Sequence, residues 1–432
     1  MGYVKSRLSL MMFLQYAMWG LWLPILDGYL QADVEAGGLG FTPSQVFYIT
    51  ALAAASGAFI GPFIGGQMAD RYFSAERFLA TLLIVGGAVQ WILAAQTSFV
   101  AWLILSVVYS ICFQPTIALT NSIAFSHLTD ANNEFPRIRV WGTIAWIAAG
   151  WVFPMVWLQT DLEFHRLPPF LAGDQVPDAT ARLIDAMRWS GALSIGYAVY
   201  CLFLPHTPPK KDVADLAFTK AFALIKRRSV AVLVITSLFI SVIHQAYFAQ
   251  TFPFFRDALG LRDSDISPAM TIGQFAEILV MAGLGLMLTR LGFRFTMAIG
   301  GTAYLLRYLI FGTTTLPTAV IISSQALHGF CFACFFATAF IYIDRIAPDD
   351  VRHSAQTAFG IIILGAGPLL SAPILSFLAK MFTVDGVLNY SSLWYSLAAI
   401  AALTTTFFVV MFRDETTGPV TAEVAEEEPV VG

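Results

Sequence analysis

A glutamine and a glutamate lie three residues apart in the apolar segment SPAMTIGQFAEILVMAGLGLML. Gln274 and Glu277 therefore share one face of the helix that this segment predicts. An ionisable group in the middle of a bilayer costs at least about 2.5–3.5 kcal/mol, so it should face a cavity or a partner. A carboxylate can accept hydrogen bonds from hydroxyl groups or take up a proton. The pair suits a polyhydroxylated ligand and a proton, and pairing of Glu277 with Arg307 is the alternative.

A second polar stripe occurs in the segment FPRIRVWGTIAW. Arg139, Thr143 and Trp146 follow one another at positions i, i+4 and i+7, which places them on one helix face. A guanidinium, a hydroxyl and an indole can together bind and stack a flat polar ligand. The alternative is that Arg139 only anchors the end of the helix at the membrane interface.

Two further segments carry histidines among aromatic residues. In ISVIHQAYFAQTFPFF, His244 and Tyr247 share a helix face with Gln245 beside it, which favours the wall of a cavity. In ALHGFCFACFFATAF, His328 and Phe332 are four residues apart, so the aromatic ring can lie above the imidazole. The other phenylalanines of that segment are interpreted as packing residues.

One more carboxylate stands in the first apolar segment, WGLWLPILDGYL. Pro24 removes a backbone hydrogen bond there, so the helix is loosened just before Asp27. Asp27 either reaches water at the outer end of the helix or relays a proton.

The composition is that of a membrane protein. The chain has 432 residues, of which 57% are hydrophobic and 12% charged, and its mean hydropathy is +0.71. Soluble domains have about 25% charged residues. The net charge of −4 and the absence of a basic arm argue against a nucleic-acid partner. No metal site and no cofactor other than a coupling proton are expected.

Apolar runs of about 20 residues, the length of a membrane-crossing helix, recur along the whole chain. They predict an all-α membrane protein with twelve transmembrane helices in two pseudo-symmetric six-helix bundles. The expected spans are near residues 8–30, 45–69, 78–96, 98–126, 140–159, 189–206, 229–255, 267–289, 294–313, 317–344, 354–381 and 390–412.

The positions of lysine and arginine predict the orientation. Most of them fall on one side of the membrane when the spans alternate, and that side is the cytoplasm by the positive-inside rule. A multi-pass protein with both termini in the cytoplasm follows. The predicted parts are a bundle over 1–206, a connecting segment over 207–228, a second bundle over 229–413 and a disordered acidic tail over 414–432.

An internal repeat supports two bundles. GGQMADRYFSAERF follows the second span and GLGLMLTRLGFRF follows the eighth, and each contains glycines and two basic residues. Repeats of this kind place a substrate site at their interface near the middle of the membrane. Asp70 and Arg71 can join neighbouring helix ends through charge interactions and so act in gating. The alternative is a charge pair in a loop whose position only follows the membrane topology.

The strings FLQYAMWGLWLPIL, PTIALTNSIAF, FPRIRVWGTIAW, QFAEIL and RHSAQ resemble the bacterial nucleoside:proton symporters, a family of the major facilitator superfamily. The resemblance covers nearly the whole chain. It implies uptake of nucleosides across the bacterial inner membrane, driven by the proton gradient through alternating access, by a protein that works as a monomer. It also implies a substrate site made of Arg139, Thr143, Trp146, His244, Gln245, Tyr247, Gln274, Glu277, His328 and Phe332.

The chain departs from the family at two positions. His328 stands where characterised relatives have a tyrosine, and Ala333 stands where they have an acidic residue beside the aromatic. We therefore expect Glu277 to carry the proton, alone or with Asp27 or a histidine. Arg307 is expected to have a structural role.

Three other functions compete with this interpretation. A carrier of the same fold for a sugar or a drug would use similar glutamine and tryptophan chemistry, so composition leaves it open. An enzyme is disfavoured because HExxH, GxSxG and metal-spaced histidine sets are absent from the sequence. A channel is disfavoured because its pore would need rings or a continuous lining of polar groups.

Overall fold

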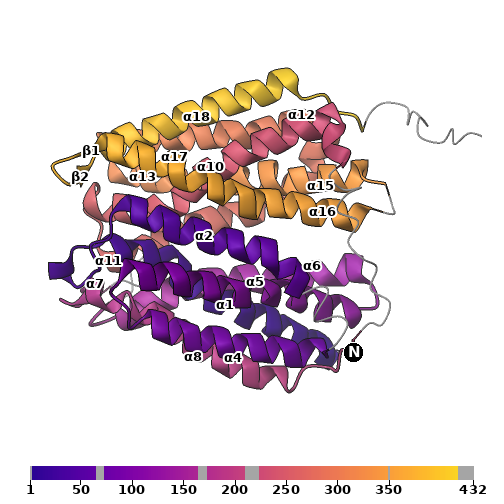
Figure 1. The fold of residues 1–432 in the computed structure, drawn as a ribbon, viewed down its shortest axis with the longest axis horizontal. Helices are drawn as coiled ribbons and strands as arrows, with labels where there is room; N and C mark the ends of the chain where they lie inside the picture. The colour runs from indigo at the N-terminus through magenta and orange to yellow at the C-terminus, as the bar shows by residue number, and fades with distance from the viewer. Residues whose placement is uncertain (1, 65–72, 164–172, 210–222, 349–350, 417–432) are drawn as a thin grey trace, which may run out of the picture.

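The structure is a computed structural model that describes residues 2–64, 73–163, 173–209, 223–348 and 351–416. Long helices run side by side along the longest axis of the molecule (Figure 1). The first set of helices occupies residues 2–201. It consists of α1 (Gly2–Gln31), η1 (Val34–Ala36), α2 (Pro43–Pro62), α4 (Ala75–Leu93), α5 (Phe99–Ser126), α6 (Ala131–Trp157), α7 (Ala179–Arg182) and α8 (Asp185–Cys201).

The second set begins after residue 223 and lies beside the first (Figure 1). A short hairpin joins its last two long helices, with Thr383 of one strand opposite Leu388 of the other. The set consists of η3 (Leu224–Lys226), α10 (Arg228–Asp257), α11 (Asp263–Met270), α12 (Ile272–Gly312), α13 (Thr318–Ser323), η4 (Ser324–Ala326), α14 (Leu327–Phe330), η5 (Cys331–Ala337), α15 (Thr338–Ile346), α16 (Arg352–Ile361), η6 (Ile362–Ala366), α17 (Gly367–Phe382), β1 (Thr383–Val384), β2 (Val387–Leu388) and α18 (Tyr390–Met411).

Within the described residues, ten helical runs are long and apolar enough to cross a membrane, against the twelve expected spans. The difference has two causes. The eighth and ninth expected spans form one helical run, because only Gly292 leaves the helical conformation between them (φ 72°, ψ 176°). A positive φ of this kind suits glycine, which lacks a Cβ. The sixth span corresponds to α8, which has 17 residues.

The tenth expected span has an irregular backbone. Residues 318–346 form one apolar run, but the run passes through a 3-10 turn and then through the π-helix η5 (Cys331–Ala337). In a π-helix the hydrogen bonds join residues that are five apart, instead of four as in an α-helix. Side chains after its start are therefore rotated relative to those before it. This change affects residues that the sequence places in the site.

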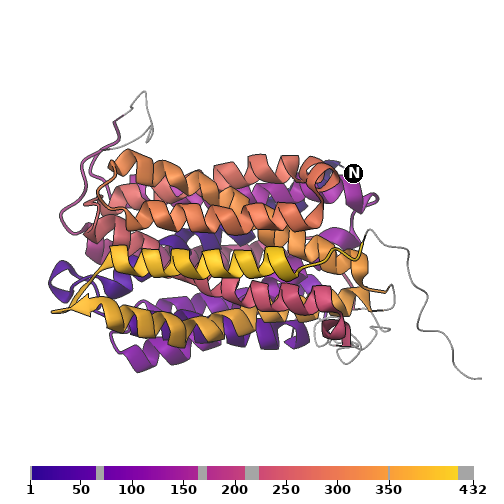
Figure 2. The same cartoon turned by 90° about the horizontal axis from the view of Figure 1, so that it is seen from above.

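The two sets contact each other along α1 with α10 and along α2 with α17. In the turned view, the yellow helix α18 runs across the front of the molecule (Figure 2). We call the end of the bundle that holds β1 and β2 the hairpin end, and the opposite end, which holds the N-terminus, the N-terminal end (Figure 1).

Hydrogen bonds join the two sets near the hairpin end. The Gln31 side-chain amide donates to the Ala249 carbonyl at 3.0 Å and accepts from the Gln250 amide at 3.0 Å. The Arg256 guanidinium donates to the Gly28 carbonyl at 2.8 Å. Further links in this region are Trp151 to Thr271, Thr180 to Asp263, Arg262 to Gly173, Ser264 to Gln175 and Ser44 to Ser376.

At the N-terminal end, no hydrogen bond joins a described residue of one set to a described residue of the other. The bonds there stay within a set, as between Lys5 and Glu134 or between Arg227 and the Ile346 carbonyl. Among the described residues, hydrogen bonds therefore join the two sets at the hairpin end only, and we call these bonds the hairpin-end seam.

Replacing Gln31 and Arg256 together by alanine should open this seam. The change removes three hydrogen bonds worth roughly 1 kcal/mol each, which would shift an open–closed equilibrium by about a hundredfold. Spin labels at the exposed positions Val34 and Val387, in a background without the four native cysteines, should then report a longer distance. Arg182→Ala is the control, because Arg182 bonds only within the first set. An unchanged distance distribution in the double variant would show that the seam does not hold this end closed.

Candidate functional site

Arg139 lies on α6 in contact with an aromatic residue of α1. Its guanidinium carbon is 4.0 Å from the centroid of the Tyr16 ring, a cation–π contact. Two turns further along α6, Trp146 meets Trp19 edge-on at 5.2 Å. The two helices approach closely here, since a Cβ on Gly20 would lie 3.0 Å from the Trp146 Cα. Aromatic side chains of α1 thus fix the orientation of the polar stripe on α6.

The stripe itself remains available for a ligand. Arg139, Thr143 and Trp146 are all half-buried. Among the described residues, the side chain of Thr143 has no hydrogen-bond partner, and Arg139 has its aromatic contact with Tyr16 but no ion pair. A cation and a hydroxyl four residues apart on one face can therefore receive an acceptor and a hydroxyl from the same molecule.

Glu277 lies on α12, whose start is joined to α6, the helix of Arg139, by the hydrogen bond from Trp151 to Thr271 at 2.8 Å. The two groups belong to different sets of helices, yet no ion pair within 4.0 Å connects them. Glu277 and Gln274 are half-buried, and their side chains have no hydrogen-bond partner among the described residues. The carboxylate and the amide on α12 and the guanidinium on α6 therefore form no hydrogen bond or ion pair with one another.

A buried cluster in the second set is centred on Arg307. Its side chain is fully buried, and its Nη1 lies 2.9 Å from Nδ1 of His328. The guanidinium carbon is 4.1 Å from the Tyr247 ring centroid and close to 5 Å from the rings of Tyr304 and Tyr308. Among the described residues no carboxylate pairs with Arg307, so the suggested pairing with Glu277 does not form. Aromatic faces and an imidazole stabilise this cation instead.

The two histidines of the site stack on each other. The rings of His244 and His328 are 5.8 Å apart with an interplanar angle of 14°. Tyr247 covers the His328 ring at 4.8 Å, and the Tyr304 hydroxyl lies 2.6 Å from Nδ1 of His244. Gln245, the neighbour of His244, is half-buried and has no side-chain hydrogen bond to a described residue.

Phe332 does not lie above the imidazole of His328. The rings that contact His328 are those of Tyr247, His244 and Phe248, and Phe332 is 36% exposed and touches Phe336. The reason is the π-helix that begins at Cys331 and turns Phe332 away from the position that regular α-helical spacing predicts.

The remaining predicted residues lie elsewhere. Asp27 is buried, with only 4% of its surface exposed, and its Oδ1 has no hydrogen-bond partner among the described groups. It stands on α1 next to Gly28, whose carbonyl takes part in the hairpin-end seam. Asp70 and Arg71 lie outside the described residues, so the proposed gating pair stays a prediction.

Several residues that contact the predicted site could not be identified from a single sequence segment. Tyr16, Trp19 and Tyr304 contact predicted site residues from other helices. Tyr16 and Trp19 are three apart in the first apolar segment, which is the one local signal for a shared face. Tyr304 carries no such signal, because its role depends on which helices are neighbours.

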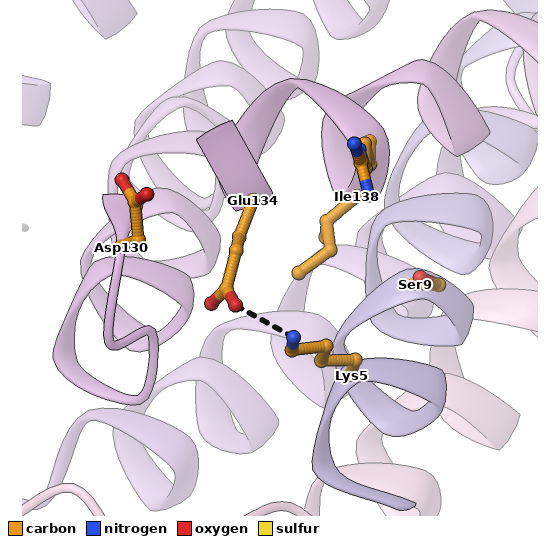
Figure 3. A pocket seen from close by; sticks show the side chains of 6 residues that line it. Lys5, Ser9, Asp130, Glu134 and Ile138 are labelled. Atoms are coloured by element: carbon orange, nitrogen blue, oxygen red, sulfur yellow. Dashed lines mark hydrogen bonds and ion pairs between the residues drawn. The ribbon is translucent and has the colours of Figure 1, made fainter. Parts of the chain in front are cut away.

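A hollow at the surface lies apart from these residues. It lies at the N-terminal end between α1 and α6, has a volume of about 280 Å³, and is lined by Lys5, Ser9, Asp130, Glu134, Arg137 and Ile138 (Figure 3). The Lys5 ammonium and the Glu134 carboxylate face each other across it at 2.6 Å. It opens at the surface and does not include the polar stripe of α6.

Comparisons with known proteins agree over nearly the whole chain. Residues 2–417 match the model of the family described as nucleoside H+ symporter. YegT of Escherichia coli (strain K12) is 30% identical over 424 residues, covering 95% of this chain and 94% of that protein. The nucleoside permease NupG of the same organism is 25% identical over 431 residues, covering 95% and 96%.

Solved structures show the same fold. The crystal structure of NupG superimposes with a TM-score of 0.79 at 25% identity, covering 95% of this chain and 99% of that one. A mutant form of NupG gives 0.83 at 24% identity, covering 95% and 100%. A D-xylose–proton symporter gives 0.69 at 16% identity, covering 96% and 99%, which supports the major facilitator fold alone.

Gly329→Ala should destabilise the protein. A Cβ at Gly329 would lie 2.5 Å from the backbone nitrogen of Glu277, and two helix backbones cannot separate without loss of packing. Overpacking of this kind costs typically about 1–3 kcal/mol, so the apparent melting temperature of the purified protein should fall by several degrees. Gly283→Ala on the same α12 is the matched control, since nothing lies within 4 Å of its Cβ position. Equal melting temperatures for both variants would contradict the close approach.

Proposed function

Since the chain belongs to the nucleoside H+ symporter family and is a proton-coupled nucleoside transporter rather than an enzyme, we propose where it binds its substrate and its proton. The nucleoside binds between α6 of the first set and α10, α12 and α14 of the second. Arg139 and Thr143 contact it from one side, and Gln274 and Glu277 from the other.

The observation that carries this proposal is the relation between Arg139 and Glu277. Their helices meet where Trp151 of α6 donates to Thr271, the residue before α12, at 2.8 Å, yet no ion pair joins Arg139 to Glu277. A charge inside a bilayer needs a partner or a water-accessible space. A polar ligand between the two groups would satisfy both charges and would bind the two sets of helices at the same time.

The proposed contacts follow from the chemistry of a nucleoside. Ribose hydroxyls can donate to the Glu277 carboxylate and exchange hydrogen bonds with the Gln274 amide. The base can stack on Trp146, which Trp19 holds edge-on, or on Phe332. His244, Gln245, Tyr247 and His328 form the adjoining wall of the site.

The proton is proposed to bind Glu277. A protonated Glu277 loses its attraction to Arg139 and can donate a hydrogen bond, whereas the ionised form only accepts. Coupling then requires that the loaded and the empty carrier change conformation more readily than the carrier with one ligand, a difference in free energy between states. Asp27 is proposed as a second proton-binding group near the hairpin end.

The orientation is proposed from the basic residues. The starts of α1 and α6 and the ends of α15 and α18 lie at the N-terminal end (Figure 1). Basic residues stand at or next to these helix ends, so this end is assigned to the cytoplasm, with both termini there; they are Lys5, Arg7, Arg137, Arg345 and Arg413. The hairpin-end seam then closes the outer side, so this structure represents a carrier closed to the outside of the bacterial inner membrane. The parts 1–206 and 229–413 are proposed as the two moving bodies of a monomer, because one chain supplies both walls of the site.

The deciding experiment is uptake into proteoliposomes that contain the purified protein. Labelled uridine, adenosine and xylose are compared with and without an imposed gradient, acidic on the outside. We expect saturable accumulation of at least one nucleoside only with the gradient, and no accumulation of xylose. Accumulation of xylose but of neither nucleoside would assign the carrier to sugars and overturn the proposal.

Glu277→Gln should abolish accumulation against a gradient. The amide cannot release or bind a proton in the range of physiological pH, so transport would be uncoupled while equilibration down a nucleoside gradient can persist. Accumulation driven by a pH gradient is expected to fall by at least tenfold. Glu35→Gln, at an exposed position of the hairpin end, is the matched control and should accumulate normally. Concentrative uptake by Glu277→Gln would refute the assignment of the proton to this residue.

A further inference from the structure

The contact between Arg307 and His328 determines which nitrogen of the imidazole carries a hydrogen. A guanidinium stays protonated in proteins and has only donors. Its Nη1 is 2.9 Å from Nδ1 of His328, so Nδ1 must accept this hydrogen bond. A neutral imidazole with one accepting nitrogen has its hydrogen on the other nitrogen. The hydrogen of His328 is therefore on Nε2.

From this geometry we infer that Arg307 is a positioning residue that holds His328 as a pure hydrogen-bond donor, through Nε2–H, toward an acceptor atom of the nucleoside. The inference rests on the proposed function, because it needs the nucleoside to bind beside Glu277. The class of ligand group is thereby specified. It is an unprotonated ring nitrogen, a carbonyl oxygen or a ribose oxygen, and not an N–H group.

Packing holds the imidazole in this orientation. Its ring stacks on two rings of α10, those of Tyr247 at 4.8 Å and His244 at 5.8 Å, with interplanar angles of 26° and 14°. On the backbone side, a Cβ at Gly273 would lie only 2.9 Å from the Cβ of His328. These contacts and the hydrogen bond at Nδ1 restrict rotation of the ring, and Nε2 has no hydrogen-bond partner among the described residues. The free donor is thus fixed in direction before any ligand arrives.

The surrounding charges oppose a second proton on His328. The titratable and charged groups that face it are Arg307 from α12 and His244 and Tyr247 from α10, while Glu277 of α12 has its backbone nitrogen against the neighbouring Gly329. An imidazolium would place two cations within 2.9 Å of each other in a buried site and would lose its hydrogen bond from Arg307. His328 therefore recognises substrate and does not carry the transported proton.

The direct test is nuclear magnetic resonance of the full-length protein in detergent with ¹⁵N-labelled histidine, with His328 assigned by comparison with His328→Gln. We expect a neutral ring with hydrogen on Nε2 from about pH 5.5 to about 8.5, a range that brackets the ordinary titration of histidine. In Arg307→Gln the preference for this tautomer should be lost, and Arg307→Lys should restore it because an ammonium also only donates. Hydrogen on Nδ1, or a cationic ring in the native protein, would overturn the inference without bearing on the proposed function.

Ligand binding provides a second, functional readout. Dissociation constants are measured for uridine, adenosine, 4-thiouridine, 2′-deoxyuridine, 3-deazaadenosine and 7-deazaadenosine, each analogue lacking or weakening one acceptor. One analogue should bind the native protein about tenfold more weakly than its parent, as expected for one lost hydrogen bond. His328→Phe should bind that parent and analogue equally, and His328→Tyr, which keeps a donor, should discriminate again.

Arg307→Gln should lose the same discrimination, although Arg307 does not contact the ligand. A purely structural role of Arg307 would instead lower the amount of folded protein and leave the ratio between parent and analogue unchanged. Discrimination that persists in His328→Phe would contradict the donor role. If the native protein bound none of these nucleosides, the proposed function itself would fail, while the tautomer of His328 would still be decided by the resonance experiment.

Discussion

A charge within a lipid bilayer has to be balanced by a partner, and the arrangement of this protein follows from that requirement. Arg307 is balanced inside one set of helices by three tyrosine faces and the nitrogen of His328. Arg139 has the ring of Tyr16 as its partner, and the Glu277 side chain has no partner among the described residues. The buried cation of Arg307 thus has its partners within one set. On the proposed function, Arg139 and Glu277 would instead be satisfied by a ligand or a proton, which would alter how strongly the two sets attract each other.

The sequence alone was sufficient for the architecture and for the choice of polar segments. Apolar runs and the repeat predicted twelve spans in two bundles, and the family resemblance implied the major facilitator fold, which the family and solved structures confirm. The spacing of Gln274 with Glu277 and of Arg139 with Thr143 placed each pair on one helix, as the structure has it. Local spacing is a reliable guide here because i, i+3 and i+4 relations depend only on helix geometry.

The sequence alone could not predict the contacts between helices. Nothing near Arg307 in the chain shows that it would bind His328 rather than Glu277, since the choice depends on how α12 folds back at Gly292. Phe332 was misplaced because a π-helix cannot be read from a run of phenylalanines and cysteines. Tyr16 contacts Arg139 and Tyr304 contacts His244 from other helices, and the sequence does not show which helices are neighbours. The role of each predicted site residue in binding remains a proposal.

The kink of α12 at Gly292 restricts how the two parts of this helix can move. A single non-helical residue separates the segment with Glu277 from the segment with Arg307, so the chain has no slack between them. Neither segment can tilt far without carrying the other, and the contact of Gly329 with the Glu277 backbone adds the His328 segment to the same unit. On the proposed function, protonation of Glu277 would therefore act on all three segments together, and the hinge would lie at the boundary between the sets rather than among these segments.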